Sequence, residues 1–161
     1  PEEKTTPVFC DSDRIRQVLS VLLHNAFSFC PSGSRITLSL SQQDKITSIS
    51  VADNGPGIPD DRKAHLFDRF YRGDSSRQDT GHFGLGLSIA REIMDAHHGS
   101  LTVSDTPGGG STFTLILNNY RKNALTQTNQ IFRVLFSCRF KGGMHGQLRK
   151  ADIRRRYGNM C

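Results

Sequence analysis

Three segments of the chain combine polar groups and glycines in patterns that suit ligand binding. In residues 53–59 (DNGPGIP), an aspartate precedes two glycines that are spaced by one residue. The carboxylate can accept a hydrogen bond from an exocyclic amine, and the glycines let the backbone come close to a flat ring. The same residues also suit an ordinary turn, so this segment alone leaves both interpretations open.

The second segment, residues 81–87 (GHFGLGL), leads directly into a helical pattern. Glycine-rich backbone at the start of a helix presents free N–H groups and a partial positive charge to phosphates. The segment has neither the GxGxxG spacing after a strand nor the GK[ST] ending of the common phosphate loops. The third candidate is Asn25, whose amide oxygen suits a metal ion, although an asparagine in an apolar helix is also typical of a satisfied core residue.

Hydrophobic periodicity predicts the elements that must position these groups. Apolar residues recur at helical spacing over 13–29 and again from Leu85 to the predicted cap at Gly99. On the second helix, the predicted apolar face consists of Leu87, Ile89, Ala90, Ile93 and Met94. Residues 60–67 favour a short helix, and the polar, glycine-rich residues 71–84 favour a loop.

Alternating polar and apolar residues predict two hairpins. The predicted strands are residues 35–41, 45–52, 100–104 and 111–117. The one-sided alternation is typical of a sheet that is covered on a single face. We therefore expect an α+β fold, a two-layer sandwich in which the helices pack on one face of a mixed, mostly antiparallel sheet.

The charge of the chain divides at about residue 118. The 161 residues carry a net charge of +6, but residues 1–118 have a net charge of −3 and residues 119–161 a net charge of +9. The total would suggest nucleic acid or a membrane surface, yet the folded part is mildly acidic. We expect one domain over 1–118 and a basic tail over 119–161.

The tail has several interpretations. The abrupt change in character favours a disordered or aberrant extension over a functional arm. The alternatives are an arm whose arginines at 154–156 bind nucleic acid or anionic lipid, and a membrane-surface segment at 131–140 (IFRVLFSCRF).

Five ordered segments together resemble the catalytic ATP-binding domain of two-component sensor histidine kinases, in the GHKL superfamily. They match its N, G1, F, G2 and G3 boxes and read QVLSVLLHNA, DNGPGIP, LFDRFYRGDSS, GHFGLGLSIA and GGGSTF. The resemblance covers about residues 8–118, and the F-box-like segment favours histidine kinases over gyrase, Hsp90 and MutL. It implies the Bergerat (GHKL) ATP-binding fold, with ATP held between the helices and a flexible lid.

The resemblance implies how the adenine of ATP is held. Asp53 would accept a hydrogen bond from the adenine amino group, and Thr112 would support Asp53 through a water molecule. The residues that would line the adenine pocket are Gly55, Gly57 and Ile58.

The resemblance also implies how the phosphates are held. Asn25 would help to coordinate the Mg²⁺ ion that bridges them, because a neutral amide and phosphate oxygens suit this hard cation. Arg72 would reach the terminal phosphate, with a solvated loop cation as the alternative, and Gly81 would act as a lid hinge. The residues that would approach the phosphates at the start of the second helix are Gly84, Leu85 and Gly86.

Some positions depart from the pattern of these kinases. Val21 stands where the family often has Asn, and Ser28 where it often has Lys or Arg. Phe29 replaces a frequent Tyr, while His82 and Phe83 replace small lid residues. These differences predict weaker ATP binding and leave two alternatives to a kinase: a degenerate, non-catalytic nucleotide-binding or interaction module, and a GHKL-type ATPase.

The resemblance implies partners as well. Histidine kinases phosphorylate a histidine within an H-[ED]-x-x-x-P pattern on a separate dimerisation domain, and the six histidines of this chain lie in other contexts. We therefore expect the ATP-binding half of an enzyme, a protein histidine kinase, that donates the γ-phosphoryl group to such a domain of the same kinase. A response regulator would act downstream. The domain would be the cytoplasmic part of a bacterial-type membrane sensor.

Overall fold

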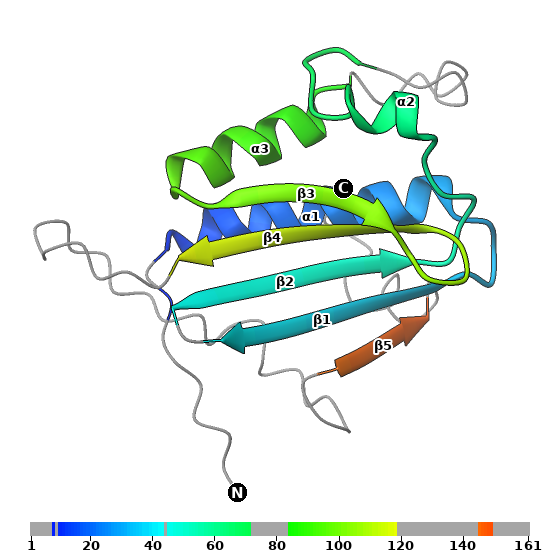
Figure 1. The fold of residues 1–161 in the computed structure, drawn as a ribbon, viewed down its shortest axis with the longest axis horizontal. Coiled ribbons are helices and arrows are strands. Elements are labelled where there is room, and N and C mark those ends of the chain that lie inside the picture. The colour runs from blue at the N-terminus through cyan, green and yellow to red at the C-terminus, as the bar shows by residue number, and fades with distance from the viewer. Residues whose placement is uncertain (1–7, 9, 44, 72–83, 119–144, 150–161) are drawn as a thin grey trace, which may run out of the picture.

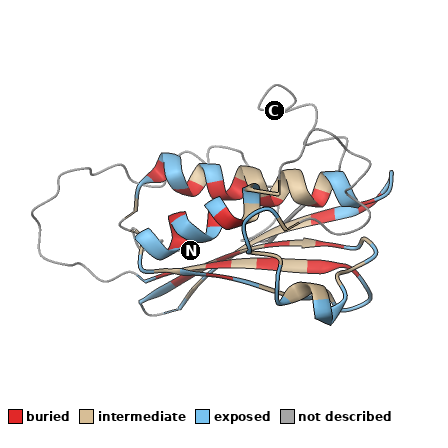
Figure 2. Ribbon diagram, turned by 90° about the horizontal axis from the view of Figure 1, so that it is seen from above, coloured by how far each residue is buried: buried red, intermediate tan, exposed pale blue. Residues whose placement is uncertain are grey.

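The computed structural model describes residues 8, 10–43, 45–71, 84–118 and 145–149 of the chain. These residues form two layers, one antiparallel sheet and two long helices on the same face of it (Figures 1 and 2). The helices are α1 (Ser12–Phe29), α2 (Asp60–Lys63) and α3 (Gly86–Ala96). The strands are β1 (Arg35–Gln43), β2 (Ile46–Asp53), β3 (Ser100–Asp105), β4 (Ser111–Asn118) and β5 (His145–Arg149).

Helix α1 begins and ends where its sequence dictates. The side chain of Asp11 accepts hydrogen bonds from the backbone N–H groups of Asp13 and Arg14, at 3.0 and 3.1 Å, and so caps the first turn. The helix ends before Pro31, because the residue preceding a proline avoids the helical conformation. Its buried apolar residues follow the predicted helical spacing and are Ile15, Val18, Leu19, Leu22 and Ala26.

Helix α3 buries a narrower stripe than the sequence predicts. Ala90, Ile93 and Met94 are buried as expected, but Ile89 is 39% exposed. Ser88 is buried instead, because its hydroxyl donates to the carbonyl oxygen of Leu85 at 2.9 Å and is satisfied there. The prediction that Ile89 faces the core was therefore wrong.

Helix α2 is shorter than the predicted helix over residues 60–67. After Lys63 the chain continues in tight turns, in which the N–H of His65 donates to the oxygen of Arg62 and that of Asp68 to the oxygen of His65. Hydrogen bonds of this i to i+3 type replace the α-helical pattern.

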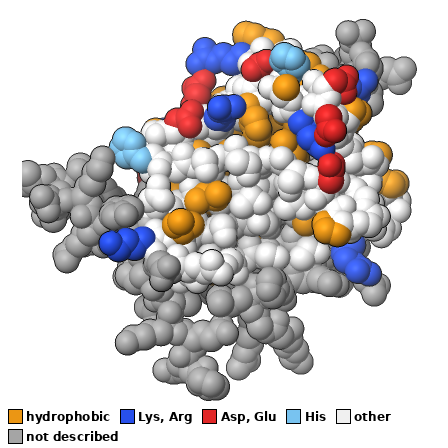
Figure 3. Space-filling view, in the orientation of Figure 1, with side chains coloured by type: hydrophobic (Ala, Val, Ile, Leu, Met, Phe, Trp, Pro, Cys, Tyr) orange, Lys and Arg blue, Asp and Glu red, His pale blue; other side chains and the backbone are white. Residues whose placement is uncertain are grey.

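The sheet has the strand order β3-β4-β2-β1-β5, and each neighbouring pair is antiparallel. The register brings apolar residues together on the helix-facing side, for example Ile49 with Leu115 and Val51 with Phe113. The other side is lined by small hydroxyl residues, such as Ser50 and Thr114, whose oxygens lie 3.0 Å apart. In Figure 3 this face carries its charged side chains mainly near the edges. The fold class expected from the sequence is confirmed.

One strand lies in the basic tail, where the sequence pattern predicts none. Strand β5 pairs with β1, with Arg149 opposite Arg35 and His145 opposite Ser39. The remaining residues of the tail, including 131–140 and 154–156, lie outside the described residues. In the described part of the chain, no helix is long and apolar enough to cross a membrane.

Candidate nucleotide-binding site

Asp53 is the last residue of β2 and is held in a fixed orientation. Its side chain is on the helix-facing side of the sheet, and the residue is 7% exposed. Oδ1 accepts the backbone N–H of Gly55 at 2.9 Å and that of Ser111 at 3.2 Å. Among the residues that the structure describes, no group donates to Oδ2. The carboxylate therefore has one anchored oxygen and one that can accept from a ligand.

The turn between β3 and β4 packs directly on Asp53. Gly110 has a φ of +104°, and a Cβ built on it would lie 2.7 Å from the carbonyl carbon of Asp53 and 2.8 Å from the Cα of Asn54. A Cβ on Gly57, where φ is +76°, would lie 3.5 Å from the oxygen of Gly110. The loop after β2 and this turn are thus in backbone contact, which only glycine at position 110 permits.

The loop after β2 is also fixed from its other sides. Oδ1 of Asn54 accepts the backbone N–H of Arg35 at 2.6 Å, and the N–H of Asn54 donates to the oxygen of Arg35 at 3.3 Å. A Cβ on Gly55 would lie 2.8 Å from Sγ of Cys30, the residue that ends α1. The first glycine segment therefore lies against both β1 and the end of α1.

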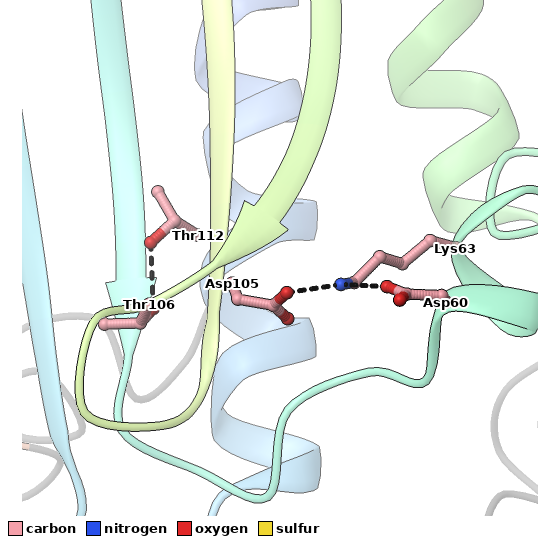
Figure 4. A network of polar contacts seen from close by, with 5 residues as sticks. All are labelled: Asp60, Lys63, Asp105, Thr106 and Thr112. Carbon is pink, nitrogen blue, oxygen red and sulfur yellow. Dashed lines mark hydrogen bonds and ion pairs between the residues drawn. The ribbon is translucent and has the colours of Figure 1, made fainter.

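Thr112 has a direct partner in the structure. Its hydroxyl lies 2.8 Å from that of Thr106, at the base of the β3–β4 turn (Figure 4). The residue of this segment that binds Asp53 directly is Ser111, through its backbone N–H. The sequence reasoning missed Ser111 and Gly110, although the run of three glycines at 108–110 marks a turn that can approach another backbone closely.

The second glycine segment opens α3 without a side-chain cap. Gly84 has a φ of +67°, and its oxygen accepts the N–H of Phe70 at 3.1 Å. Leu85 is the N-cap residue, and no side chain of the described residues bonds the first N–H groups of the helix. Among the described residues these N–H groups therefore have no side-chain partner, and the binding of an anion to them stays a prediction.

Helix α1 contacts both glycine segments. A Cβ on Gly86 would lie 3.3 Å from Cγ1 of Val21, whereas Gly55 lies against Cys30, about 13 Å further along the helix axis. Asn25 is half-buried and lies between these points, one turn after Val21 on the same face. The structure therefore brings Asn25 to the side of α1 that meets the start of α3.

The other predicted site residues divide into two groups. Ile58 is half-buried and packs against the core. Arg72 and Gly81 lie outside the described residues. The segment just before Arg72 is anchored to α3, because Nε of Arg69 donates to Glu92 at 3.0 Å.

The sequence profile of one protein family matches most of the described chain. The family described as histidine kinase-, DNA gyrase B- and HSP90-like ATPase matches residues 10–121. The chain belongs to this family. Within it, the chain is a catalytic ATP-binding domain of the sensor histidine kinase type, which is the resemblance that the five sequence segments predict.

Related proteins and solved structures support this family assignment. The adaptive-response sensory kinase SasA of Microcystis aeruginosa is 39% identical over 116 residues, which are 71% of this chain and 30% of that kinase. The mycobacterial sensor histidine kinase MprB matches with a TM-score of 0.62 and 31% identity, over 69% of this chain and 76% of that structure. Full-length ShkA in complex with AMPPNP matches with a TM-score of 0.59 and 32% identity, over 70% of this chain and 23% of that structure.

Proposed function

We propose that this ATPase-family domain binds ATP with Mg²⁺ and donates the γ-phosphoryl group to a histidine on a separate dimerisation domain. The observation that carries the proposal is the carboxylate of Asp53, anchored through Oδ1 between two glycine loops with Oδ2 left to accept from a ligand. An anchored acceptor beside backbone that can approach a flat ring suits the amino edge of adenine. The matching structure of full-length ShkA is a complex with AMPPNP, which supports a nucleotide as the ligand of this domain.

The phosphates would lie at the other glycine segment. The free N–H groups at the start of α3 and the positive end of its dipole would bind phosphate oxygens. Gly84 and Gly86 would allow this approach, and Gly81 would act as the hinge of a lid over the nucleotide. Arg72 would present its planar fork to the terminal phosphate and offset the charge that develops on transfer.

The donor set fits Mg²⁺ held mainly by the nucleotide. In the described part of the chain, no group of three His, Cys, Asp or Glu side chains could hold a metal ion. Mg²⁺ commonly keeps several waters and takes few protein ligands besides substrate phosphates, so the amide oxygen of Asn25 suffices as the ligand from this chain. When bound, the ion would offset negative charge on the phosphates.

The chain's own residues would position the reactants and would form no covalent intermediate. The phosphate acceptor would be a histidine of the dimerisation domain of the same kinase, and a response regulator would take the phosphoryl group from it. Such a kinase would sense its stimulus at a membrane and keep this domain in the cytoplasm. The chain spans 30% of the length of the Microcystis kinase, so these partners belong to the proposal for a whole kinase.

Titration calorimetry with ATP, with and without Mg²⁺, tests the pocket. Asp53→Asn should weaken ATP binding about 10- to 100-fold, since a hydrogen bond to a charged group is worth about 1.5–3 kcal/mol. Asp61→Asn is the matched control, because it makes the same chemical change at an exposed residue of α2. Wild-type protein that binds no ATP, or equal binding by the two variants, would rule out this pocket.

A degenerate, non-catalytic module is the second candidate, because Val21 presents a methyl group to Gly86 where the family often has a polar Asn. Mixing the chain with the dimerisation domain of a related kinase and radiolabelled ATP separates the two functions. Phosphohistidine formed in trans supports the kinase, whereas ATP binding without transfer supports the module.

A further inference from the structure

Lys63 lies between two carboxylates at the far end of the loop that follows Asp53. Its Nζ donates to Oδ1 of Asp60 and to Oδ2 of Asp105, each at 2.7 Å (Figure 4). The side chain of Lys63 is 17% exposed, whereas the side chains of Asp60 and Asp105 are 93% and 68% exposed. Hydrogen bonds to Asp105 and then to Asp60 raise the pKa of Lys63, so the ammonium group stays charged at neutral pH.

The contact with Asp105 joins two segments that are far apart in sequence. Lys63 ends the segment that starts at Asp53, and Asp105 is the last residue of β3, directly before the turn that leads to Ser111. The start of the loop is bonded to the end of the turn, through Asp53 and Ser111. The end of the loop is bonded to the start of the turn, through Lys63 and Asp105.

The loop and the turn are therefore bonded to each other at both of their ends. Between these two bonds, Gly57 approaches the oxygen of Gly110. The turn is itself braced, since the N–H of Thr106 donates to the oxygen of Gly110 at 3.0 Å and that of Gly109 to the oxygen of Thr106 at 2.9 Å. The internally bonded turn can therefore hold the loop in place, as long as both ends of the loop stay bonded to the turn.

We propose that Lys63 is a positioning residue for the nucleotide, which acts through Asp105 to hold Gly57 and Ile58 against the adenine. This inference rests on the proposed function, because it assigns the loop to the adenine pocket. Asp60 has a secondary part: it lies three residues before Lys63 on α2 and directs the ammonium group toward β3. The role of Lys63 is thus distinct from that of a lysine that binds phosphate directly.

Titration calorimetry of the full chain with ATP and with ADP tests this role. Lys63→Met and Asp105→Ala should each weaken both nucleotides by the same factor, about 3- to 5-fold, which is the upper range for coupling by a partly exposed ion pair. The double variant should be no weaker than Lys63→Met alone, because both changes break the same contact between Lys63 and Asp105. Lys63→Arg should restore most of the affinity, since a guanidinium group can reach the same carboxylates.

The control is Arg16→Met, which breaks an i, i+3 ion pair of 2.8 Å with Asp13 on the outer face of α1. It should leave both affinities unchanged. Circular dichroism at the titration temperature confirms that every variant is folded, so that lost affinity reports the pocket and not unfolding.

Other outcomes overturn the inference. If Lys63→Met binds both nucleotides as wild type does, while Asp53→Asn binds ATP more weakly, the inference fails and the proposed function stands. If Lys63→Met weakens ATP more than ADP, or Asp105→Ala strengthens binding, Lys63 contacts phosphate directly and positioning is refuted. If wild-type protein binds neither nucleotide, the proposed function fails with the inference.

Discussion

Replacing Gly110 with alanine should damage the nucleotide site more than the same change one residue earlier. Gly109 and Gly110 have similar φ angles, +109° and +104°, which are unfavourable for any other residue. A Cβ on Gly109 would meet nothing within 4 Å, whereas a Cβ on Gly110 would overlap the backbone of Asp53 and Asn54. Both variants therefore place a Cβ at a strained φ, and Gly110→Ala in addition brings it too close to neighbouring backbone.

The expected loss of stability follows from the backbone strain and the close approach. The strain of an alanine at such a φ costs about 1–3 kcal/mol in either variant. In Gly110→Ala the turn must also move away from Asp53, which breaks the hydrogen bond from Ser111. Loss of a hydrogen bond to a charged group adds about 1.5–3 kcal/mol, and the midpoint of thermal unfolding falls by about 2–8 °C for each kcal/mol in a protein of this size.

Two measurements on each variant test this reasoning. Thermal unfolding should place Gly109→Ala below wild type and Gly110→Ala lower still. ATP titration should show wild-type affinity for Gly109→Ala and an affinity at least about 10-fold lower for Gly110→Ala, because the anchor of the Asp53 carboxylate is lost. Equal ATP affinities for the two variants would refute the claim that the turn positions Asp53.

Three further predictions concern the rest of the domain. His97→Ala should lower the free energy of unfolding in urea by about 1–3 kcal/mol, because the ring bonds the oxygen of Ile93 at 2.7 Å and accepts the N–H of Asp11 at 3.1 Å; an unchanged midpoint would contradict this. The N–H groups of Arg14 and Asp13 lower the pKa of Asp11 below 3.8, so its stabilisation is present above that pH and lost as pH falls through the lowered pKa. Urea unfolding between pH 2.5 and 6 should therefore show a shallower acid decline for Asp11→Asn than for wild type, and parallel curves would argue against this. Burial raises the pKa of Cys10 from 9.0 to about 11, so iodoacetamide at pH 8 should label this thiol roughly 100-fold more slowly than an unperturbed thiol. Equal labelling rates in folded and urea-unfolded protein, measured by mass spectrometry, would contradict the raised pKa.

The sequence predicts the layers of this fold because each long element buries one face. Ile15, Val18 and Leu22 repeat at helical spacing, and Ile49 and Val51 alternate with hydroxyl residues, so local pattern alone indicates α1 and β2. The same alternation indicates where this strand ends, which places Asp53 at the C-terminal end of β2. The buried face of α3 was less predictable, because it includes a polar residue, Ser88, whose hydroxyl is satisfied by the carbonyl oxygen of Leu85.

The contacts that shape the site were not predictable from local pattern. Ser111 is 58 residues from Asp53, and Asp105 is 42 residues from Lys63. Both contacts depend on how the β3–β4 hairpin is aligned with β2, and hydrophobic spacing within single elements carries no information about that alignment. Strand β5 was missed because its five residues include a glycine and show no alternation.

The pairing of β2 with β4 has a consequence for the integrity of the chain. The chain leaves the sheet after Asp53, returns to it in β3 and, after the β3–β4 turn, reaches Ser111, whose N–H bonds Asp53. Antiparallel pairing from Ile46 to Ala52 with Asn118 to Thr112, and the packing of α1 against α3, join the two halves without the peptide bonds between them. A domain cut by a protease within residues 72–83 should therefore elute as a single complex of two fragments. Each fragment would hold one of the two glycine segments that we propose to bind the base and the phosphates, so separately expressed halves should regain nucleotide binding only when mixed.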